Sequence, residues 1–356
     1  MTVFSAESFA DHEQVVFVSD PDSGLRAIIA IHDTSLGPAL GGCRMYPYPS
    51  EEDALRDVLR LSRGMTYKAA AAGLDLGGGK AVIIGDPRRQ KTPALLQAMG
   101  RAVDRMAGRY ITAEDVGTTV ADFAEVHKTT RHVVGLPVEL GGTGDPSPTT
   151  ALGVFLGLEA AARHRWNGRT LSGRTVAVQG LGNVGWHLCR YLAEAGARLV
   201  VADVDEDRTA RAAAAFSAEV VRPQAIYAVE ADIFAPCAMG AVLNDETLPQ
   251  LRCAIIGGAA NNQLACDAHG ERLRERGILY APDFVINAGG MIRVALERDG
   301  FAQALLDDRL KGLAATLSAI FERAERDGKP TQATAIDLAQ ERLRAARARQ
   351  APSLAA

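Results

Sequence analysis

The chain has 356 residues, of which 47% are hydrophobic and 23% are charged, with a formal net charge of −4. This composition is typical of a globular protein long enough for two domains, and it excludes the basic footprint of a nucleic-acid-binding protein. The five cysteines are scattered without a Cys-x-x-Cys pair, so we expect reduced thiols and no metal site. No signal-peptide pattern and no apolar stretch of membrane-spanning length occur, which predicts a cytoplasmic protein without membrane contact.

Hydrophobic patterns predict the first elements of the chain. Apolar runs indicate strands between residues 15 and 48. Residues 51–72 have apolar side chains at helical spacing, with Ser50 as a candidate N-cap. A glycine-rich loop at 77–79 is then expected to lead into a short buried strand at 82–84.

Glycine and proline are densest at residues 135–148, which predicts a domain boundary and hinge there. Beyond it, helical patterns alternate with short apolar runs, as in a doubly wound α/β domain. Long helices are expected between about 302 and 349. The basic residues near the end of the chain are predicted to form a solvated or subunit-contact helix face: Arg342, Arg344, Arg347 and Arg349. The predicted strands of this half are 175–179, 198–202, 233–234, 254–256 and 278–280.

A Gly-x-Gly-x-x-Gly motif follows the first of these strands and precedes a helical pattern, which is the context of a dinucleotide site. Glycines allow a tight turn and close approach to a pyrophosphate, which binds the N–H groups of the helix N-terminus. Asp203 ends the next strand, where a carboxylate binds both ribose hydroxyls and repels a 2′-phosphate. Neither Val204 nor Asp205 supplies the cation that NADP needs, so NAD is expected. The predicted contacts to the cofactor here are Gly180, Gly182, Asn183, Val184, Gly185 and Asp203.

Two lysines lie among glycines in the N-terminal half. Lys68 ends the segment 64–68, and Lys80 follows three consecutive glycines. The segment that ends at Lys80 is not a phosphate-binding P-loop, because Leu74 and Ala81 stand where that motif needs Gly and Ser or Thr. One lysine can hold a carboxylate as a cation, and the other can act as a base. For either segment alone, a glycine turn with a surface lysine is the alternative.

Taken together, six motifs resemble the glutamate/leucine/phenylalanine/valine dehydrogenases, and the leucine-specific members in particular. The resemblance runs from about residue 15 to about 345 and implies two α/β domains in a homo-oligomer, either a dimer or an octamer. A substrate-binding and oligomerisation domain would occupy residues 1–145, completed by a C-terminal helix at about 331–356. A Rossmann-type, doubly wound NAD-binding domain would occupy residues 146–330. The six motifs are residues 37–44, 64–68, 77–80, 112–117, 234–237 and 258–262.

The same resemblance implies a role for each site residue. Lys80 would activate the water that adds to the imino carbon, Asp115 would shuttle protons to and from the amine, and Lys68 would bind the α-carboxylate. Cys237 is explained equally well as a small buried side chain. The other expected substrate contacts are Gly41, Gly42, Met65, Asn262, Leu40, Ala113, Met291 and Val294. The expected contacts to the nicotinamide and its ribose are Thr150, Cys237, Ala238 and Asn261.

Specificity for the substrate side chain is expected to depend on four apolar residues of that set, which are Leu40, Ala113, Met291 and Val294. The glutamate enzymes carry a lysine where Leu40 stands, so a second substrate carboxylate would be buried here without a partner. The expected reaction is therefore reversible, NAD-dependent oxidative deamination of leucine, valine and isoleucine to 2-oxo acids and ammonium. Phenylalanine dehydrogenases tend to have glycine at the position of Ala113, and Met291 departs from the valine usual in leucine dehydrogenases. An enzyme for phenylalanine or another aromatic amino acid is thus the first alternative, and a non-catalytic NAD-binding sensor is a remote one.

Overall fold

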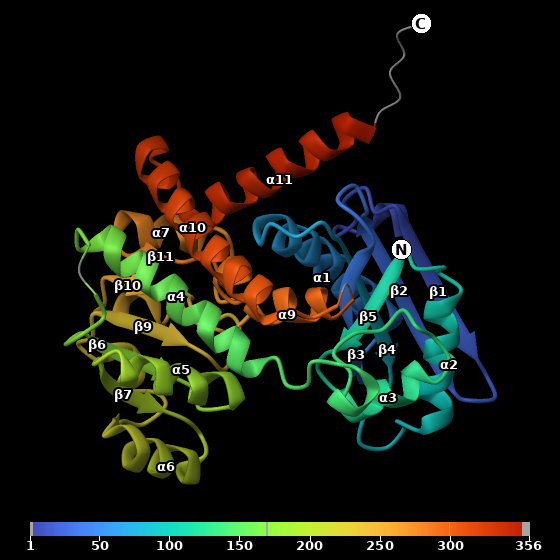
Figure 1. The fold of residues 1–356 in the computed structure, drawn as a ribbon, viewed down its shortest axis with the longest axis horizontal. Coiled ribbons are helices and arrows are strands. Elements are labelled where there is room, and N and C mark those ends of the chain that lie inside the picture. The colour runs from blue at the N-terminus through green and yellow to red at the C-terminus, as the bar shows by residue number, and fades with distance from the viewer. Residues whose placement is uncertain (1–2, 169, 299, 351–356) are drawn as a thin grey trace, which may run out of the picture. The chain divides into compact units, whose positions relative to one another are not determined.

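The computed structural model describes residues 3–168, 170–298 and 300–350. These residues divide into two compact units (Figure 1). The first unit comprises the chain up to Asp145 together with described residues of 294–301 and from 339 onward. The second unit comprises 146–293 and 302–338.

The first unit is built on a five-stranded mixed sheet in the order β1-β2-β4-β3-β5. Strands β1, β2 and β4 are antiparallel neighbours, whereas β4, β3 and β5 pair in parallel. Its elements are η1 (Val3–Ser5), β1 (Gln14–Asp20), β2 (Leu25–Asp33), β3 (Ala39–Tyr46), α1 (Glu51–Ala71), β4 (Gly77–Ile84), α2 (Pro93–Asp104), β5 (Tyr110–Glu114), α3 (Val120–His127) and η2 (Val138–Leu140).

Helices cover both faces of this sheet. Side chains alternate between the faces along a strand. Ile28 and Ala30 of β2 therefore pack in a cluster with Leu59 of α1, whereas Ile29 and Ile31 pack in the cluster that α2 and α3 complete. Helix α1 begins where the sequence predicted, after an N-cap serine whose side chain accepts a hydrogen bond from the backbone of the first turn.

The glycine-rich loop predicted at residues 77–79 is wrong, because these glycines are the first residues of strand β4. A Cβ on Gly78 would lie 2.1 Å from the backbone nitrogen of Thr66 in α1. A Cβ on Gly79 would lie 2.7 Å from the ring of the buried Tyr110. The glycines are therefore required because α1 and β5 approach β4 more closely than any side chain would permit.

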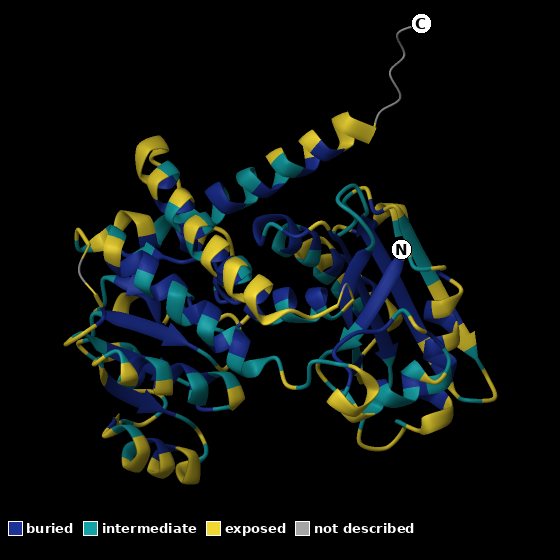
Figure 2. Cartoon of the chain, viewed as in Figure 1, coloured by how far each residue is buried: buried dark blue, intermediate teal, exposed yellow. Residues whose placement is uncertain are grey.

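The second unit is a six-stranded, all-parallel sheet in the order β11-β10-β9-β6-β7-β8, which confirms the predicted doubly wound α/β fold. Helix α10 buries one leucine-rich face, and Figure 2 shows exposed residues along its other side. The elements are α4 (Ser147–Arg165), β6 (Thr175–Gln179), α5 (Asn183–Glu194), β7 (Arg198–Ala202), α6 (Glu206–Phe216), β8 (Glu219–Val220), η3 (Ile226–Ala228), β9 (Ile233–Pro236), η4 (Leu248–Gln250), β10 (Ile255–Ile256), α7 (Ala268–Glu275), β11 (Leu279–Tyr280), α8 (Asp283–Ile286) and α10 (Gln303–Asp327).

Two helices, α9 (Gly289–Arg298) and α11 (Thr331–Gln350), contribute residues to both units. In the first unit, Glu297 of α9 accepts hydrogen bonds from the backbone N–H groups of Gly135 and Thr143, each at 3.0 Å. No helix of the described residues is long and apolar enough to cross a membrane.

Two arginines of the predicted solvated or subunit-contact face of α11 also make ion pairs within the chain. Arg342 donates to the Ala70 carbonyl at 2.9 Å and pairs with Asp75 at 2.8 Å. Arg347 pairs with the buried carboxylate of Asp33. These ion pairs fasten the C-terminal half of α11 to the first unit.

Candidate active site

Glycines remove side-chain bulk within β3 and β4, two interior strands of the first sheet. A Cβ on Gly41 would lie 1.8 Å from the carbonyl oxygen of Gly79, and a Cβ on Gly42 would lie 2.9 Å from the Cβ of Asp115. The hydroxyl of Tyr110, which is fully buried, donates to the Gly41 carbonyl at 2.7 Å. This hydrogen bond fixes the backbone of β3, and the missing side chain of Gly42 leaves room for Asp115.

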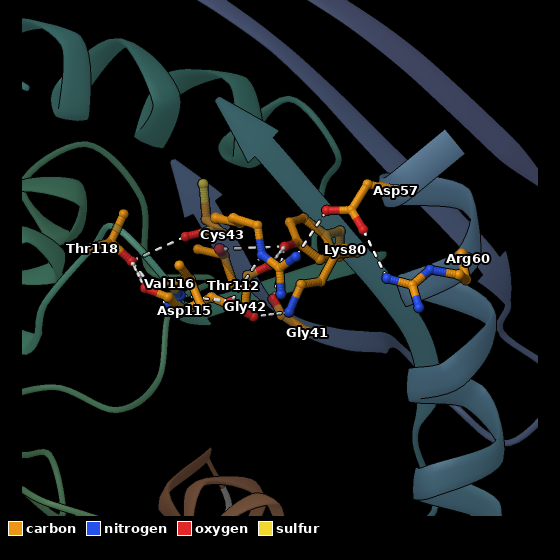
Figure 3. A network of polar contacts seen from close by, with 12 residues as sticks. Gly41, Gly42, Cys43, Asp57, Arg60, Lys80, Thr112, Asp115, Val116 and Thr118 are labelled. Atoms are coloured by element: carbon orange, nitrogen blue, oxygen red, sulfur yellow. Dashed lines mark hydrogen bonds and ion pairs between the residues drawn. The ribbon is translucent and has the colours of Figure 1, made fainter. Parts of the chain in front are cut away.

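Lys80 and Asp115 form a buried ion pair beside these glycines (Figure 3). Nζ of Lys80 contacts Oδ2 of Asp115, and their side chains are only 6% and 16% exposed. Burial opposes ionisation of Asp115, but the Lys80 ammonium and the Arg44 guanidinium outweigh it and lower the pKa of this carboxyl. The structure therefore brings the two predicted catalytic residues into direct contact, with the carboxylate held ionised.

A second group of charged residues, for which the sequence predicts no role, extends this pair. Arg44 donates from Nε to Asp115 Oδ1 at 3.3 Å and from Nη1 to Asp57 Oδ2 at 2.8 Å. The Tyr48 hydroxyl donates to the same Asp57 oxygen at 2.6 Å. Arg44 lies within a motif that the family resemblance used, but Asp57 carries no sequence signal because its contact depends on packing of α1 against β3.

Helix α1 carries the predicted substrate contacts Met65 and Lys68. A Cβ on Gly41 would lie 3.3 Å from Cγ of Met65, so Met65 packs against the glycines of β3. Lys68 is half-buried in the last turn of α1. Because α1 touches β4 at Gly78, the segments that carry Lys68 and Lys80 lie close together, and the role of Lys68 stays a prediction.

Three of the predicted pocket residues belong to the first unit. Leu40 on β3 is 2% exposed. Ala113 on β5 is half-buried and pairs with Gly42 across the sheet. Val294 lies on α9, with Cγ1 4.0 Å from a Cβ built on Gly135. Their side chains supply only hydrocarbon surface.

In the second unit, the glycine motif forms the turn between β6 and α5. Gly180 has a φ of +95°, and a Cβ there would lie 2.6 Å from the Cβ of Ala238. A Cβ on Gly185 would lie 2.0 Å from the Gly180 carbonyl. Gly182 is the N-cap of α5, has open space around it and makes no side-chain cap. The first turn, with Asn183 and Val184, contains no acid, so its N–H groups suit a pyrophosphate.

Asp203 follows β7 at the same edge of the sheet, and its side chain is 6% exposed. Oδ2 accepts from Leu181 N–H at 2.6 Å, and Oδ1 accepts from Asp205 N–H at 2.9 Å. Each carboxylate oxygen keeps a further lone pair for a ribose hydroxyl. Arg208 carries no sequence signal of a contact with this acid. Its Nη1 lies 4.0 Å from Asp203 Oδ2, because the turn into α6 brings it back toward the acid.

The other predicted cofactor contacts follow β9 and β10 or lie on α4. Cys237 N–H donates to the Gln179 carbonyl at 2.7 Å, which places it beside the glycine turn. Asn261 accepts from Asn287, an unpredicted partner, at 2.8 Å. Thr150 lies on α4, where its hydroxyl donates to the Pro146 carbonyl at 3.1 Å.

Two predicted substrate contacts also belong to the second unit. Asn262 is exposed and has a φ of +51°, a backbone conformation that asparagine tolerates better than most residues. Met291 lies on α9 and is 6% exposed. Their roles toward the substrate stay predictions.

Comparison with known proteins identifies the family. Residues 12–132 match the Glu/Leu/Phe/Val dehydrogenase dimerisation domain, and residues 141–207 and 201–350 match the Glutamate/Leucine/Phenylalanine/Valine dehydrogenase model. A leucine dehydrogenase of Geobacillus stearothermophilus is 52% identical over 354 residues, covering 99% of this chain and 96% of the relative. A phenylalanine dehydrogenase of Caldalkalibacillus thermarum is 49% identical over 348 residues, covering 96% and 94%. The crystal structure of L-tryptophan dehydrogenase from Nostoc punctiforme matches with a TM-score of 0.85 and 48% identity, covering 95% of this chain and 97% of that one.

The fold and the site thus define an NAD(P)-dependent amino-acid dehydrogenase. The chain belongs to the Glu/Leu/Phe/Val dehydrogenase family, which confirms the prediction from its motifs. Relatives of nearly equal identity bear leucine, phenylalanine and tryptophan in their names. The substrate of this chain therefore depends on the residues that surround the amino-acid side chain.

Proposed function

We propose that this chain catalyses the reversible, NAD-dependent oxidative deamination of leucine, valine and isoleucine to 2-oxo acids and ammonium. The buried contact between Lys80 and Asp115 carries the proposal, because it brings a proton donor and a proton acceptor together beside the closely packed glycines of β3 and β4. Membership of the dehydrogenase family supplies the reaction class.

Lys68, Asp115 and Lys80 of the first unit each have a separate task in this proposal. NAD, when bound, accepts the hydride from the substrate Cα. Lys68 holds the α-carboxylate as a cation, and Asp115 takes a proton from the substrate ammonium. Lys80, once its ammonium has released a proton, takes a proton from the water that adds to the imino carbon. Because Nζ of Lys80 contacts Oδ2 of Asp115, a proton can pass directly between the two groups.

The residues of the second unit favour NAD over NADP. The uncapped N-terminus of α5 suits the pyrophosphate. The carboxylate of Asp203 suits a ribose diol and repels a 2′-phosphate. Arg208 is already paired with Asp205 at 3.2 Å, which weakens it as a phosphate ligand.

Apolar residues support an aliphatic substrate. Leu40 and Ala113 offer no partner for a second carboxylate, whose burial would be costly. Aromatic amino acids are the second candidate, supported by the phenylalanine and tryptophan dehydrogenases among the relatives. Ala113→Gly should improve phenylalanine relative to leucine by about tenfold in kcat/KM, since one methylene is worth about 1–3 kcal/mol in an apolar pocket.

The test is a spectrophotometric panel that follows NADH formation with the twenty common amino acids. Leucine, valine and isoleucine should give the highest kcat/KM, and glutamate should give none. A preference for phenylalanine or tryptophan would replace the aliphatic assignment with the aromatic one. Lys80→Ala should lose nearly all turnover and keep NAD binding, whereas the control Lys128→Ala, in an exposed ion pair, should match wild type. A Lys80→Ala rate above about a tenth of wild type would refute the base, because general-base catalysis contributes about 10²–10⁴-fold.

We also propose that the chain assembles into a homo-oligomer, a dimer or an octamer. The match of residues 12–132 to a domain described as a dimerisation domain supports this. Light scattering coupled to size exclusion should give a multiple of the 37.7 kDa chain mass, and a monomer mass at working concentration would contradict it.

A further inference from the structure

The two carboxylate oxygens of Asp115 have different partners. Oδ2 contacts Nζ of Lys80, whereas Oδ1 accepts hydrogen bonds from Arg44 Nε at 3.3 Å and from Val116 N–H at 2.6 Å. A carboxylate held at one oxygen by two donors cannot rotate about its Cβ–Cγ bond without breaking both hydrogen bonds. Oδ2 is therefore the oxygen left for proton exchange.

Arg44 is itself held on its far side. Its Nη1 pairs with Asp57 Oδ2 at 2.8 Å, and Asp57 also accepts from the Tyr48 hydroxyl at 2.6 Å and from Arg60 at 3.1 Å. The side chains of Arg44 and Asp57 are only 22% and 15% exposed. Figure 3 labels Lys80, Asp115, Asp57 and Arg60 of this network, with dashed lines for the hydrogen bonds and ion pairs between the residues drawn. Only a planar guanidinium can bridge two carboxylates with directed N–H groups in this way.

We propose that Arg44, anchored by Asp57, is a positioning residue that fixes Asp115 with Oδ2 toward Lys80 and keeps it ready to accept a proton. Arg44 acts through Asp115 and not on the substrate. This inference rests on the proposed roles of Lys80 and Asp115, and it adds a determinant of their pH dependence that lies on β3 and α1.

The ionisation of Asp115 depends on the groups around it. Burial raises the pKa of the Cys43 thiol to about 12 and raises the pKa of the Tyr110 hydroxyl well above its usual range, so both stay neutral near pH 7. Burial, together with Asp145 and Asp115, raises the pKa of Glu114, which makes it the competing titratable group. The charged and titratable groups facing Asp115 are Lys80 of β4, Arg44 and Cys43 of β3, Tyr110 and Glu114 of β5, and Asp57 of α1 through Arg44.

The experiment measures kcat for leucine against pH in the full-length protein. Arg44→Met should lower kcat at neutral pH by at least about tenfold and move the acid limb upward by about one pH unit or more, since a nearby arginine lowers a carboxyl pKa by about 1–3 units. The KM for NAD should change by less than about twofold. Arg44→Lys should keep the acid limb at its wild-type pH, because the positive charge remains. It should not keep the wild-type kcat, because an ammonium lacks the planar, forked N–H donors of a guanidinium. The control Arg26→Met breaks the exposed pair with Glu51 and should match wild type.

Asp57→Asn provides a second variant should Arg44→Met fail to fold. Asparagine has a similar size but no charge, so it anchors Arg44 less firmly, and kcat should fall by at least about threefold. The acid limb should not move upward, because the charge of Arg44 remains beside Asp115. The proposal is overturned if folded Arg44→Met keeps both the kcat and the acid limb of wild type, or if folded Asp57→Asn and Arg44→Lys keep the wild-type kcat at neutral pH. A Glu114→Gln variant that moves the acid limb as far as Arg44→Met also overturns it. If Lys80→Ala loses its turnover while Arg44→Met keeps the wild-type kcat and acid limb, the proposed function stands and only the positioning role of Arg44 fails.

Discussion

A buried histidine should make the first unit sensitive to acid. His32 of β2 is 8% exposed, hydrogen-bonds through Nδ1 to the Thr66 hydroxyl at 2.8 Å, and has its ring centroid 4.9 Å from that of His12. Burial and the neighbouring His12 lower the pKa of His32 to about 4. The folded state therefore excludes a proton that the unfolded chain, with a histidine pKa of about 6.5, binds readily.

The size of the effect follows from these two values. Stability contributed by neutral His32 is fully present above the unfolded pKa and is lost as the pH falls from about 6.5 toward 4. The full loss over this window is about 3 kcal/mol, at about 1.4 kcal/mol per pKa unit. Between pH 7.5 and pH 5, the free energy of unfolding should fall by about 2 kcal/mol because of His32 alone.

The assay compares wild type and His32→Asn by urea unfolding, followed by far-UV circular dichroism, at pH 7.5 and pH 5. Asparagine can still hydrogen-bond Thr66 but does not titrate, so the variant should lose about 2 kcal/mol less than wild type between the two pH values. The control Thr66→Val removes the hydrogen bond and keeps His32, and it should destabilise the protein while retaining the wild-type pH dependence. A difference between wild type and His32→Asn below about 0.5 kcal/mol would refute the reasoning.

Three further predictions follow from the described contacts. Asp203→Ser combined with Val204→Arg should shift the ratio of kcat/KM for the two cofactors toward NADP, because an anion is lost and a cation gained beside the ribose. An unchanged ratio in a folded variant would show that Asp203 has only a structural role. Lys68→Ala should raise KM for the amino acid far more than for NAD, and equal effects would contradict the carboxylate role. Gly78→Ala should lower stability by about 1–3 kcal/mol or more, since its Cβ would strike the backbone of α1. The control Gly64→Ala lies in open space on helix α1 and should raise the free energy of unfolding by about 1 kcal/mol. Similar melting temperatures for the two alanine variants would contradict the packing argument.

Much of the fold could be predicted from the sequence because its signals are local. The cap at Ser50 and the apolar spacing after it defined α1 within one residue of its observed end. The strands β6 and β7 have the predicted bounds. Side-chain periodicity and capping act over one or two turns of chain, so they leave a readable pattern whatever the tertiary contacts are.

The loop predicted at residues 77–79 is the clearest case in which a local sequence pattern gave the wrong secondary structure. Residues 77–79 looked like a loop because glycine has no intrinsic preference for a strand. The structure uses them as strand residues because the backbone of Thr66 and the ring of Tyr110 occupy the space that side chains would need. Such a requirement arises from residues far away in the sequence, so no local pattern reveals it.

The sequence by itself determined which residues could carry chemistry: the glycine motifs, the two lysines, the acid after β5 and the acid after β7. Only the tertiary structure decided that Lys80 meets Asp115, that Arg44 links Asp115 to Asp57, and that Arg208 turns back toward Asp203. The physical reason is that an ionisable group takes its charge state and orientation from its burial and its nearest partners. Those partners come together only when the strands pair in register and α1 packs across them.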